Sequence, residues 1–231
     1  MSKLELSSSG PRRAKAITEP LEVEARLQTL HPDLTPALLR AAVIGGLGAR
    51  NDVTRASAPT AAGVQQWLKT VEDLRTILAR FQWKIHEHQN CPFISSPERE
   101  MSIVVMTGNS ETGREGFDDP TNQAEKGAVA EDYVQSNFKQ LELFNGGSLK
   151  VARRKAKETQ VWALLYHYDK NLQQVRFELS LPTGFNRKKI TQWGERLIFG
   201  VVPNGPDEFT IPKEEPGVPA TVEVVPKKGA F

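Results

Sequence analysis

The sequence predicts an α+β fold, in which N-terminal helices are followed by a mainly antiparallel sheet with at least one further helix. Two observations lead to this prediction. Helical patterns fill residues 21–80, whereas strand patterns dominate 82–107 and 160–202, with one helical pattern between them. Because helices and strands are segregated along the chain, a doubly wound parallel sheet is not expected.

The first two helices are predicted from their ends. Residues 21–30 carry a short amphipathic pattern that stops before Pro32, because proline biases its predecessor away from the helix. The pair Thr35-Pro36 is typical of an N-cap followed by the first helical residue, so a second helix is expected over 37–50. Its last turns contain three glycines, which indicate either close packing or fraying: Gly45, Gly46 and Gly48.

A third helix is expected over 64–80, because apolar residues recur there at spacings of four and three. Such residues form one stripe along a helix, which is typical of packing against a core. The stripe consists of Trp67, Val71, Leu74, Leu78 and Phe81. A groove that binds a partner is the alternative interpretation.

The first strands are short. They are expected over 82–88 and 92–96, on either side of a polar turn. The nearly continuous apolar run over 101–107 is typical of a central strand that is covered on both faces. A helix is expected over 126–138, after the polar loop 108–120.

The strongest strand signal is a hairpin over 161–181, with a turn that begins at Asp169. Its second strand alternates between apolar and polar residues, so one face is expected in the core and the other in water. The apolar residues are Val175, Phe177, Leu179 and Leu181, and the polar ones are Gln174, Arg176, Glu178 and Ser180.

Pro182 is expected to end this strand, because proline cannot donate a hydrogen bond to a neighbouring strand. A basic loop over 183–189 and a third strand over 190–202 follow. Trp193, Leu197 and Phe199 are the expected core residues of that third strand.

The chain is predicted to contain a flexible N-terminal tail over 1–20, a single α+β domain over 21–202 and a proline-rich extended tail over 203–231. The first tail is polar and the second is broken by prolines, so neither is expected to form a long element. The chain has 231 residues, of which 39% are hydrophobic and 25% charged. This composition is typical of a globular protein with a core of its own.

Charge and cysteine content exclude several classes of protein. The formal net charge is +2, so overall charge does not indicate a nucleic-acid or acidic partner. The single cysteine, Cys91, excludes an internal disulfide framework and fits a reducing compartment. No apolar run reaches the ~18 residues of a membrane span. A cytoplasmic bacterial protein that does not contact the membrane is expected.

The loop 108–120 is the first candidate site, because functional groups often lie on loops held by the end of a strand. Its candidate residues are Asn109, Glu111, Thr112 and Arg114. A solvated loop is the alternative interpretation, since its Gly and Asn residues also suit turns. The loop matches a phosphate-binding loop poorly, because no lysine follows its second glycine directly.

Metal chemistry is the second possibility. Asp118, Asp119 and Glu178 lie near expected strand ends, which favours a metal-dependent hydrolase or nuclease. The lysine that a restriction-type nuclease places two residues after such a glutamate is absent. His86, His88 and Cys91 are close in sequence but lack the fourth ligand of a typical zinc site, so neither a metal nor a cofactor is predicted.

Two basic clusters flank the central hairpin. One consists of Lys150, Arg153, Arg154, Lys155 and Lys157, and the other of Arg187, Lys188 and Lys189. An antiparallel hairpin would bring the clusters together into one surface that attracts phosphate backbones. A solubilising surface, offset by acids elsewhere, is the alternative interpretation.

Four stretches carry a resemblance to a family. They are HPDLTPALLRAA at 31–42, the helix with Trp67, SIVVMTGNSETG at 102–113, and FELSLP followed by ITQWGERLIF at 177–199. Over most of 30–202, the chain resembles an uncharacterised bacterial family of mobile or variable genomic regions. The resemblance implies no activity and therefore no catalytic residue.

The sequence lacks a complete catalytic constellation, which favours a protein that is not an enzyme. The predicted function is a non-enzymatic binding protein or accessory subunit of a bacterial multi-protein system. A protein partner is expected, together with sequence-independent contacts to nucleic acid through the basic clusters. A metal-dependent hydrolase or nuclease is the alternative.

Overall fold

The computed structural model describes residues 14–116, 118–146 and 159–205. Within these ranges the chain has four helices and an eight-stranded sheet, which confirms the predicted α+β fold. The helices are α1 (Pro20–Leu30), α2 (Pro36–Asn51), α3 (Ala61–Ala79) and α4 (Ala128–Gly146). The strands are β1 (Lys15–Ile17), β2 (Lys84–His88), β3 (Cys91–Ser95), β4 (Met101–Thr107), β5 (Gln160–Asp169), β6 (Gln174–Asn186), β7 (Lys189–Ile198) and β8 (Val202–Pro203).

The sheet is mixed but mainly antiparallel. Its strand order is β1-β7-β6-β5-β4-β3-β2, and β8 pairs with β6 beside this path. Among the described strands, only β4–β5 and β1–β7 are parallel pairs. Strand β1 lies within the predicted flexible tail 1–20, but it pairs with β7, and its Ile17 is 6% exposed. Nearly all of the predicted C-terminal tail, and residues 1–13, lie outside the described residues.

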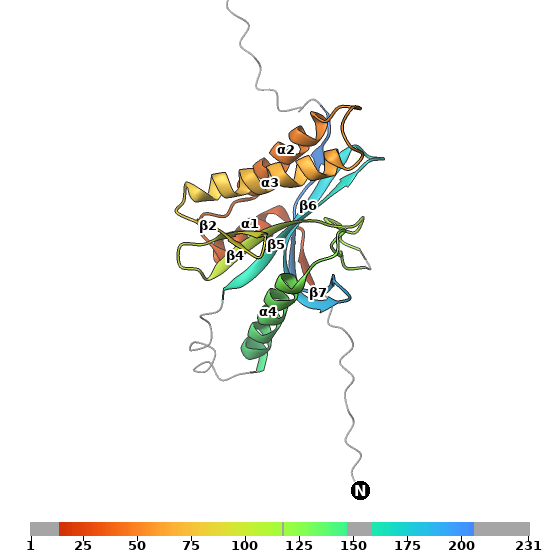
Figure 1. Cartoon of the computed structure of the whole chain (residues 1–231). Helices are drawn as coiled ribbons and strands as arrows, with labels where there is room; N and C mark the ends of the chain where they lie inside the picture. The colour runs from red at the N-terminus through yellow and green to blue at the C-terminus, as the bar shows by residue number, and fades with distance from the viewer. Residues whose placement is uncertain (1–13, 117, 147–158, 206–231) are drawn as a thin grey trace, which may run out of the picture.

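The helices cover both faces of the sheet. Helices α2 and α3 lie on one side of it and α4 on the other (Figure 1). Successive residues of a strand therefore point alternately into two cores, one on each face of the sheet. Trp162, Leu164 and Tyr166 of β5 face α2 and α3, whereas the alternate residues Val161, Ala163 and Leu165 belong to the core beneath α4. Burial of β4 on both faces is confirmed.

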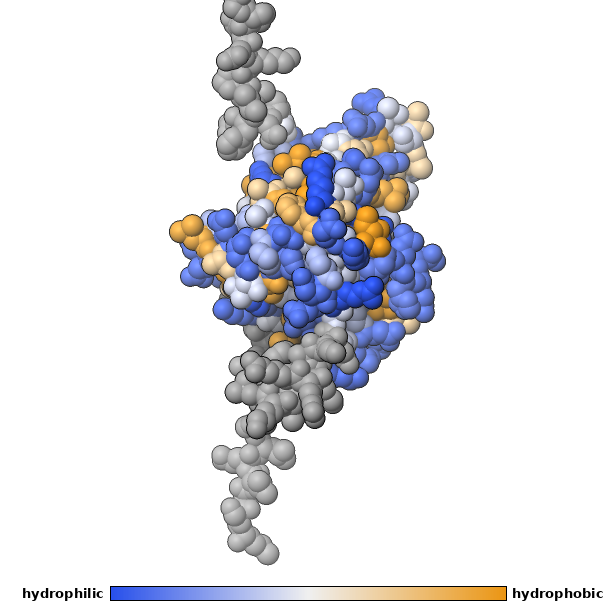
Figure 2. Space-filling view, turned by 90° about the vertical axis from the view of Figure 1, so that its left-hand side faces the viewer, coloured by the Kyte–Doolittle hydropathy of each residue, from blue (hydrophilic) through white to orange (hydrophobic). Residues whose placement is uncertain are grey.

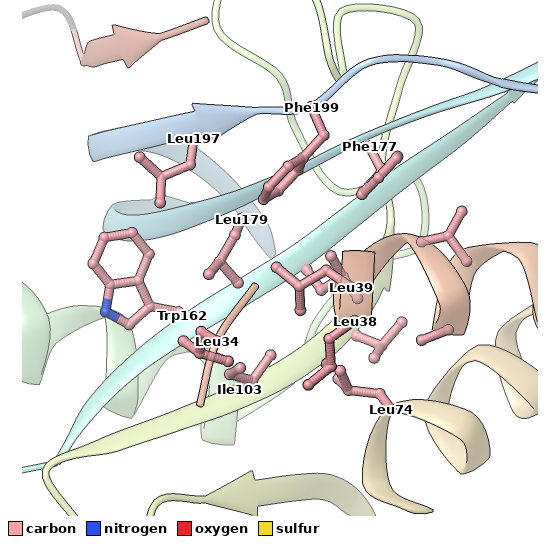
Figure 3. Packing of buried hydrophobic residues seen from close by; sticks show 14 of the residues in the cluster. Leu34, Leu38, Leu39, Leu74, Ile103, Trp162, Phe177, Leu179, Leu197 and Phe199 are labelled. Atoms are coloured by element: carbon pink, nitrogen blue, oxygen red, sulfur yellow. The ribbon is translucent and has the colours of Figure 1, made fainter. Parts of the chain in front are cut away.

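The larger core gathers side chains from helices and strands that are distant in the sequence. Leu39 of α2 and Leu74 of α3 meet strand residues such as Ile103 and Leu179 there (Figure 3). Phe177 stacks on Phe199, with ring centroids 4.9 Å apart. The predicted stripe of α3 is confirmed as a core stripe except at its end, where Phe81 is 45% exposed.

The outer surface shown in Figure 2 is mostly hydrophilic, and hydrophobic residues form small separate patches on it. Scattered apolar side chains of this kind are ordinary on a folded protein. In the described residues, most large apolar side chains lie in the two cores.

The glycines of α2 mark close packing against α3. A Cβ atom at Gly46 would lie 2.7 Å from the backbone oxygen of Gln66 and would also collide with the Thr70 hydroxyl. A Cβ atom at Gly48 would meet nothing within 4 Å. Of the two interpretations left open by the sequence, close packing therefore applies at Gly46.

We expect Gly46→Ala to lower the free energy of unfolding by about 1–2 kcal/mol, because overpacking exceeds the gain in helix propensity. The matched variant Gly48→Ala should instead raise it by up to about 1 kcal/mol, since only the propensity changes. Urea denaturation of both variants measures the difference. Equal stabilisation by both changes would contradict the close approach of α2 and α3.

Strand β6 does not end at Pro182, as predicted, but continues to Asn186. Its pairing with β7 shifts register at Leu181/Pro182, Pro182/Gly184 and Gly184/Phe185. Because the ladder is irregular there, the missing N–H of proline removes no regular hydrogen bond. The irregular segment is bound by Asn137 of α4, which donates from Nδ2 to the Pro182 oxygen over 3.0 Å.

Candidate functional site

The polar residues of β6 and β7 lie beneath the loop 108–120. Arg176, Glu178 and Ser180 are 4%, 0% and 0% exposed, and Arg196 of β7 is 2% exposed. The prediction that this face of β6 lies in water is therefore wrong. Alternation correctly separates the two faces of a strand, but it cannot show that a distant loop covers the polar one.

Arg176 holds the loop through its backbone. Its Nε and Nη2 atoms donate to the carbonyl oxygens of Thr112 (3.1 Å) and Ser110 (2.9 Å). Its Nη1 donates to Asp169 over 2.8 Å. That hydrogen bond, together with those from the backbone of residues 171 and 172, lowers the pKa of Asp169 to about 2.

Glu178 and Arg196 form a buried ion pair beneath the same loop. The Nη2 and Nε atoms of Arg196 donate to the two carboxylate oxygens over 2.6 and 3.1 Å. The Ser180 hydroxyl and the Gly113 N–H complete the hydrogen bonds of the carboxylate, each at 2.9 Å. Gly113 has φ +68°, and a Cβ atom there would lie 2.7 Å from that of Arg176, so glycine is required.

The four candidate loop residues serve the loop itself. The Asn109 side chain accepts hydrogen bonds from the N–H groups of Glu111 and Thr121, over 3.3 and 3.2 Å. Thr112 is fully buried, and Arg114 lies 3.6 Å from Asp169. The loop is therefore packed onto the sheet rather than solvated along its whole length. The Thr112 hydroxyl has no hydrogen-bond partner in the described residues, and the Arg114 side chain is 45% exposed.

The acids proposed for metal chemistry are placed around an arginine. Asp119 lies 3.5 Å from Arg196, which also holds Glu178, whereas Asp118 is exposed. A divalent ion at Glu178 would have to displace the guanidinium group. In the described parts of the chain, no three His, Cys, Asp or Glu side chains group in a way that could hold a metal ion.

The two histidines of β2 are used differently from zinc ligands. His86 Nε2 lies 2.6 Å from the Ser95 hydroxyl, which is 2.6 Å from that of Ser102. Burial, with the nearby charge of Arg75, lowers the pKa of His86 and favours the neutral ring. His88 pairs with Cys91 across the β2–β3 hairpin.

One of the two predicted basic clusters can be located. Lys150, Arg153, Arg154, Lys155 and Lys157 lie outside the described residues. Arg187 and Lys188 form the β6–β7 turn, where Lys188 pairs with Glu125 at 3.0 Å. Lys189 donates to the backbone oxygens of Asn122 and Gln123, each over 2.8 Å. The turn is thus attached to segment 122–126.

Segment 122–126 forms one wall of an open cavity of about 760 Å³ at the ends of β4 and β5, which we call the basic pocket. The other walls are the last turn of α2, the first turn of α3 and the start of the β5–β6 turn. Its lining residues are Arg50, Pro59, Thr60, Ala62, Gly63, Val64, Gln66, Trp67, Thr107, Gln123, Ala124, Lys126, Tyr166, His167, Tyr168 and Lys170.

The Lys and Arg side chains that line the basic pocket are not balanced by acidic side chains in its described lining. Arg50, Lys126 and Lys170 line it, whereas its described lining contains no Asp or Glu. The first turn of α3 adds the positive end of the helix dipole. The N–H groups of Ala61 and Val64 already donate to the oxygens of Ala58 and Thr60, which leaves those of Ala62 and Gly63 for a ligand. Burial lowers the pKa of Lys126, so that an anion beside it would restore a favourable environment for its charge.

Two buried polar groups of the pocket lack partners. Gln66 and Tyr166 are 1% and 2% exposed, and neither the Gln66 Nε2 nor the Tyr166 hydroxyl has a hydrogen-bond partner within the described structure. Buried polar groups are nearly always hydrogen-bonded. Thr112, Thr121 and Trp162, which do not line the pocket, also bury a polar atom without a partner in the described residues. Gln66 and Tyr166 both line the basic pocket, where a ligand would supply the missing partners.

Arg50 organises this part of the pocket. Its guanidinium lies 3.8 Å from the ring centroid of Tyr168, and its Nη1 donates to Gln66 Oε1 over 3.3 Å. Because arginine only donates, it fixes the Gln66 oxygen toward itself and leaves the Nε2 donor for another partner. Trp67 is also fixed, since its indole N–H donates to the Val105 oxygen over 3.1 Å.

Sequence reasoning missed this pocket, because its cations come from α2, segment 122–126 and the β5–β6 turn. The one signal in the sequence is the aromatic run Tyr166, His167 and Tyr168 near the end of β5. His167 Nδ1 lies 3.1 Å from the Gly108 oxygen, so it is tied to the loop.

Comparison of the chain with protein-family models, with curated proteins and with solved structures finds no match. The resemblance to a bacterial family therefore stays a prediction. Of the helices in the described ranges, none combines the length and the apolar character needed to cross a membrane.

Proposed function

We propose that this protein is a non-enzymatic binding protein that takes a phosphate-bearing anion in the basic pocket. The observation that carries the proposal is the combination of Arg50, Lys126 and Lys170 with no carboxylate in the described lining. The N-terminus of α3 supports it, because helix N-termini bind phosphate through free N–H groups. The volume of about 760 Å³ lies in the usual range of ligand sites.

Binding without catalysis fits the chemistry of the lining. The Tyr166 hydroxyl remains protonated, because burial raises its pKa far above the usual value. This residue therefore offers a hydroxyl donor and acceptor rather than a nucleophilic phenolate. The hydrolase alternative loses its main support, since Glu178 and Asp119 already neutralise Arg196.

Pyrophosphate binding tests the proposal. The full chain should bind pyrophosphate at low ionic strength, measured by isothermal titration calorimetry, and the affinity should fall as salt screens the pocket. Lys170→Glu should weaken binding about 10-fold, because an exposed attraction of about 0.5–1 kcal/mol becomes a repulsion.

The matched control is Lys84→Glu, which makes the same charge change at an exposed position of the edge strand β2. It should leave pyrophosphate affinity close to that of the unchanged chain. Absence of binding at millimolar pyrophosphate, or equal losses in both variants, would overturn the proposal.

An accessory role in a cytoplasmic bacterial multi-protein system is part of the same proposal. Its support is the pair Val64 and Leu68, which lie one turn apart on α3 and are 48% and 47% exposed. Neighbouring exposed apolar side chains suit a protein contact. Affinity capture of the full chain from its own cells should retain a partner that Leu68→Lys loses; capture of the same proteins by both forms would count against it.

A further inference from the structure

We infer that the ligand of the basic pocket is a nucleotide, with its phosphate on the cations and its base against the aromatic and amide wall. This inference rests on the proposed function, which requires only a phosphate-bearing anion. Three features go beyond what an inorganic anion needs. They are the size of the pocket, the fixed aromatic side chains and the two unpaired polar groups.

The size of the pocket exceeds the requirement of a bare phosphate. Its volume of about 760 Å³ accommodates a ligand with a substantial uncharged part. That part would lie beside Pro59, Val64 and Trp67, which line the pocket and are apolar. A planar base suits such a wall, because every base presents a π-face that stacks on aromatic side chains.

The aromatic wall is rigid before any ligand arrives. The indole N–H of Trp67 is already bonded to β4, so this side chain offers its ring rather than its donor. The Tyr168 hydroxyl is engaged by Gln173 at 3.0 Å, and Arg50 lies on one face of its ring. Fixed rings bind a planar ligand without a large loss of side-chain entropy.

The unpaired groups match the edge of a base. The Gln66 Nε2 group donates, and the protonated Tyr166 hydroxyl both donates and accepts. Bases carry ring nitrogens, carbonyl oxygens and amino groups at fixed positions along their edges. A fully ionised phosphate group accepts hydrogen bonds but donates none, so it would leave the accepting capacity of Tyr166 unused.

Removal of the Tyr166 hydroxyl separates a binding role from a structural one. Tyr166→Phe keeps the packing of β5 and deletes a hydroxyl that has no hydrogen-bond partner among the described residues. The melting temperature of the free chain should therefore stay the same or rise, since a buried unpaired group is unfavourable. Affinity for a nucleotide should fall about 5-fold or more, which corresponds to one lost hydrogen bond.

The deciding experiment compares adenosine 5′-monophosphate, uridine 5′-monophosphate, ribose 5-phosphate and pyrophosphate on the full chain by calorimetry. Both nucleotides should bind at least about 10-fold more tightly than ribose 5-phosphate, because their bases stack on the aromatic wall. They should also quench tryptophan emission, which ribose 5-phosphate should not. Tyr166→Phe should reduce nucleotide affinity more than pyrophosphate affinity, because only the base can use the hydroxyl both as a donor and as an acceptor.

The two hypotheses fail in different ways. Equal affinities for nucleotides and ribose 5-phosphate, with pyrophosphate still bound, would overturn the nucleotide inference and leave the phosphate site standing. A drop in the melting temperature of Tyr166→Phe without any change in nucleotide affinity would assign the hydroxyl to folding and overturn the inference as well. Failure of every phosphate compound to bind would remove the proposed function itself.

Discussion

Arg196→Met should lower the free energy of unfolding by about 3–5 kcal/mol, because it leaves the Glu178 carboxylate buried without its counter-charge. The carboxylate is fully buried, and Arg196 supplies the positive charge and two of its four hydrogen bonds. The same change removes the hydrogen bond from Arg196 to the Arg114 oxygen, which holds loop 108–120. Domains of this kind are stable by about 5–15 kcal/mol, so the loss should be evident in urea denaturation.

The matched control is Lys188→Met, which removes a lysine from an exposed ion pair with Glu125. Both side chains of that pair are more than 60% exposed, so water replaces the lost partner and stability should hardly change. The double variant Arg196→Met/Glu178→Leu should recover much of the loss, because no uncompensated charge remains. If Arg196→Met were as stable as Lys188→Met, the burial of this pair would be refuted.

The buried ion pair shows why alternation predicted the fold better than it predicted the site. Period-two alternation correctly placed Val175, Phe177 and Leu179 in the core, because that face packs against N-terminal helices. The opposite face of β6 was predicted to be exposed to water, because Arg176 and Glu178 are charged. Whether a charged residue is exposed depends on its partners, and the partners here come from loop 108–120 and β7. Local sequence does not contain that information.

Helix ends were predictable because their causes are local. The Thr35 hydroxyl accepts from the Leu38 N–H over 3.2 Å, as its position before Pro36 predicts, and α2 begins at Pro36. The Asp169 turn is also local, since its carboxylate accepts from two N–H groups just after it. By contrast, the pairing of β1 with β7 joins residues far apart in the chain, and the sequence analysis missed it.

In the candidate site, too, local features were predictable from the sequence and long-range contacts were not. The sequence indicated a loop of polar groups, and the structure places that loop as a packed cover of the sheet. The basic pocket depends on Arg50, Lys126 and Lys170, which are brought together only when α2, segment 122–126 and the β5–β6 turn meet. In the sequence, nothing distinguishes any one of these three residues from an ordinary positively charged surface residue. The first basic cluster predicted from sequence lies outside the described residues, and its role stays a prediction.

Asn137 contacts the segment of β6 that the sequence did not predict, because this strand was expected to end at Pro182. The side chain is 1% exposed and lies on α4, facing β5 and β6. Its Nδ2 donates to the oxygens of Val161 (2.8 Å) and Pro182 (3.0 Å), and its Oδ1 accepts from the Val161 N–H (3.0 Å). One amide thus bonds three backbone groups where the ladder is irregular.

Asn137→Ala should therefore cost about 3 kcal/mol or more in the free energy of unfolding, because buried backbone groups left without partners cost about 1–3 kcal/mol each. The control is Gln135→Ala, an exposed position on the same helix, which should be nearly neutral. Hydrogen exchange gives a second readout: the Val161 amide should lose protection in Asn137→Ala beyond the loss of global stability. Stability equal to that of Gln135→Ala, with the Val161 amide still protected, would show that the irregular segment of β6 does not depend on α4.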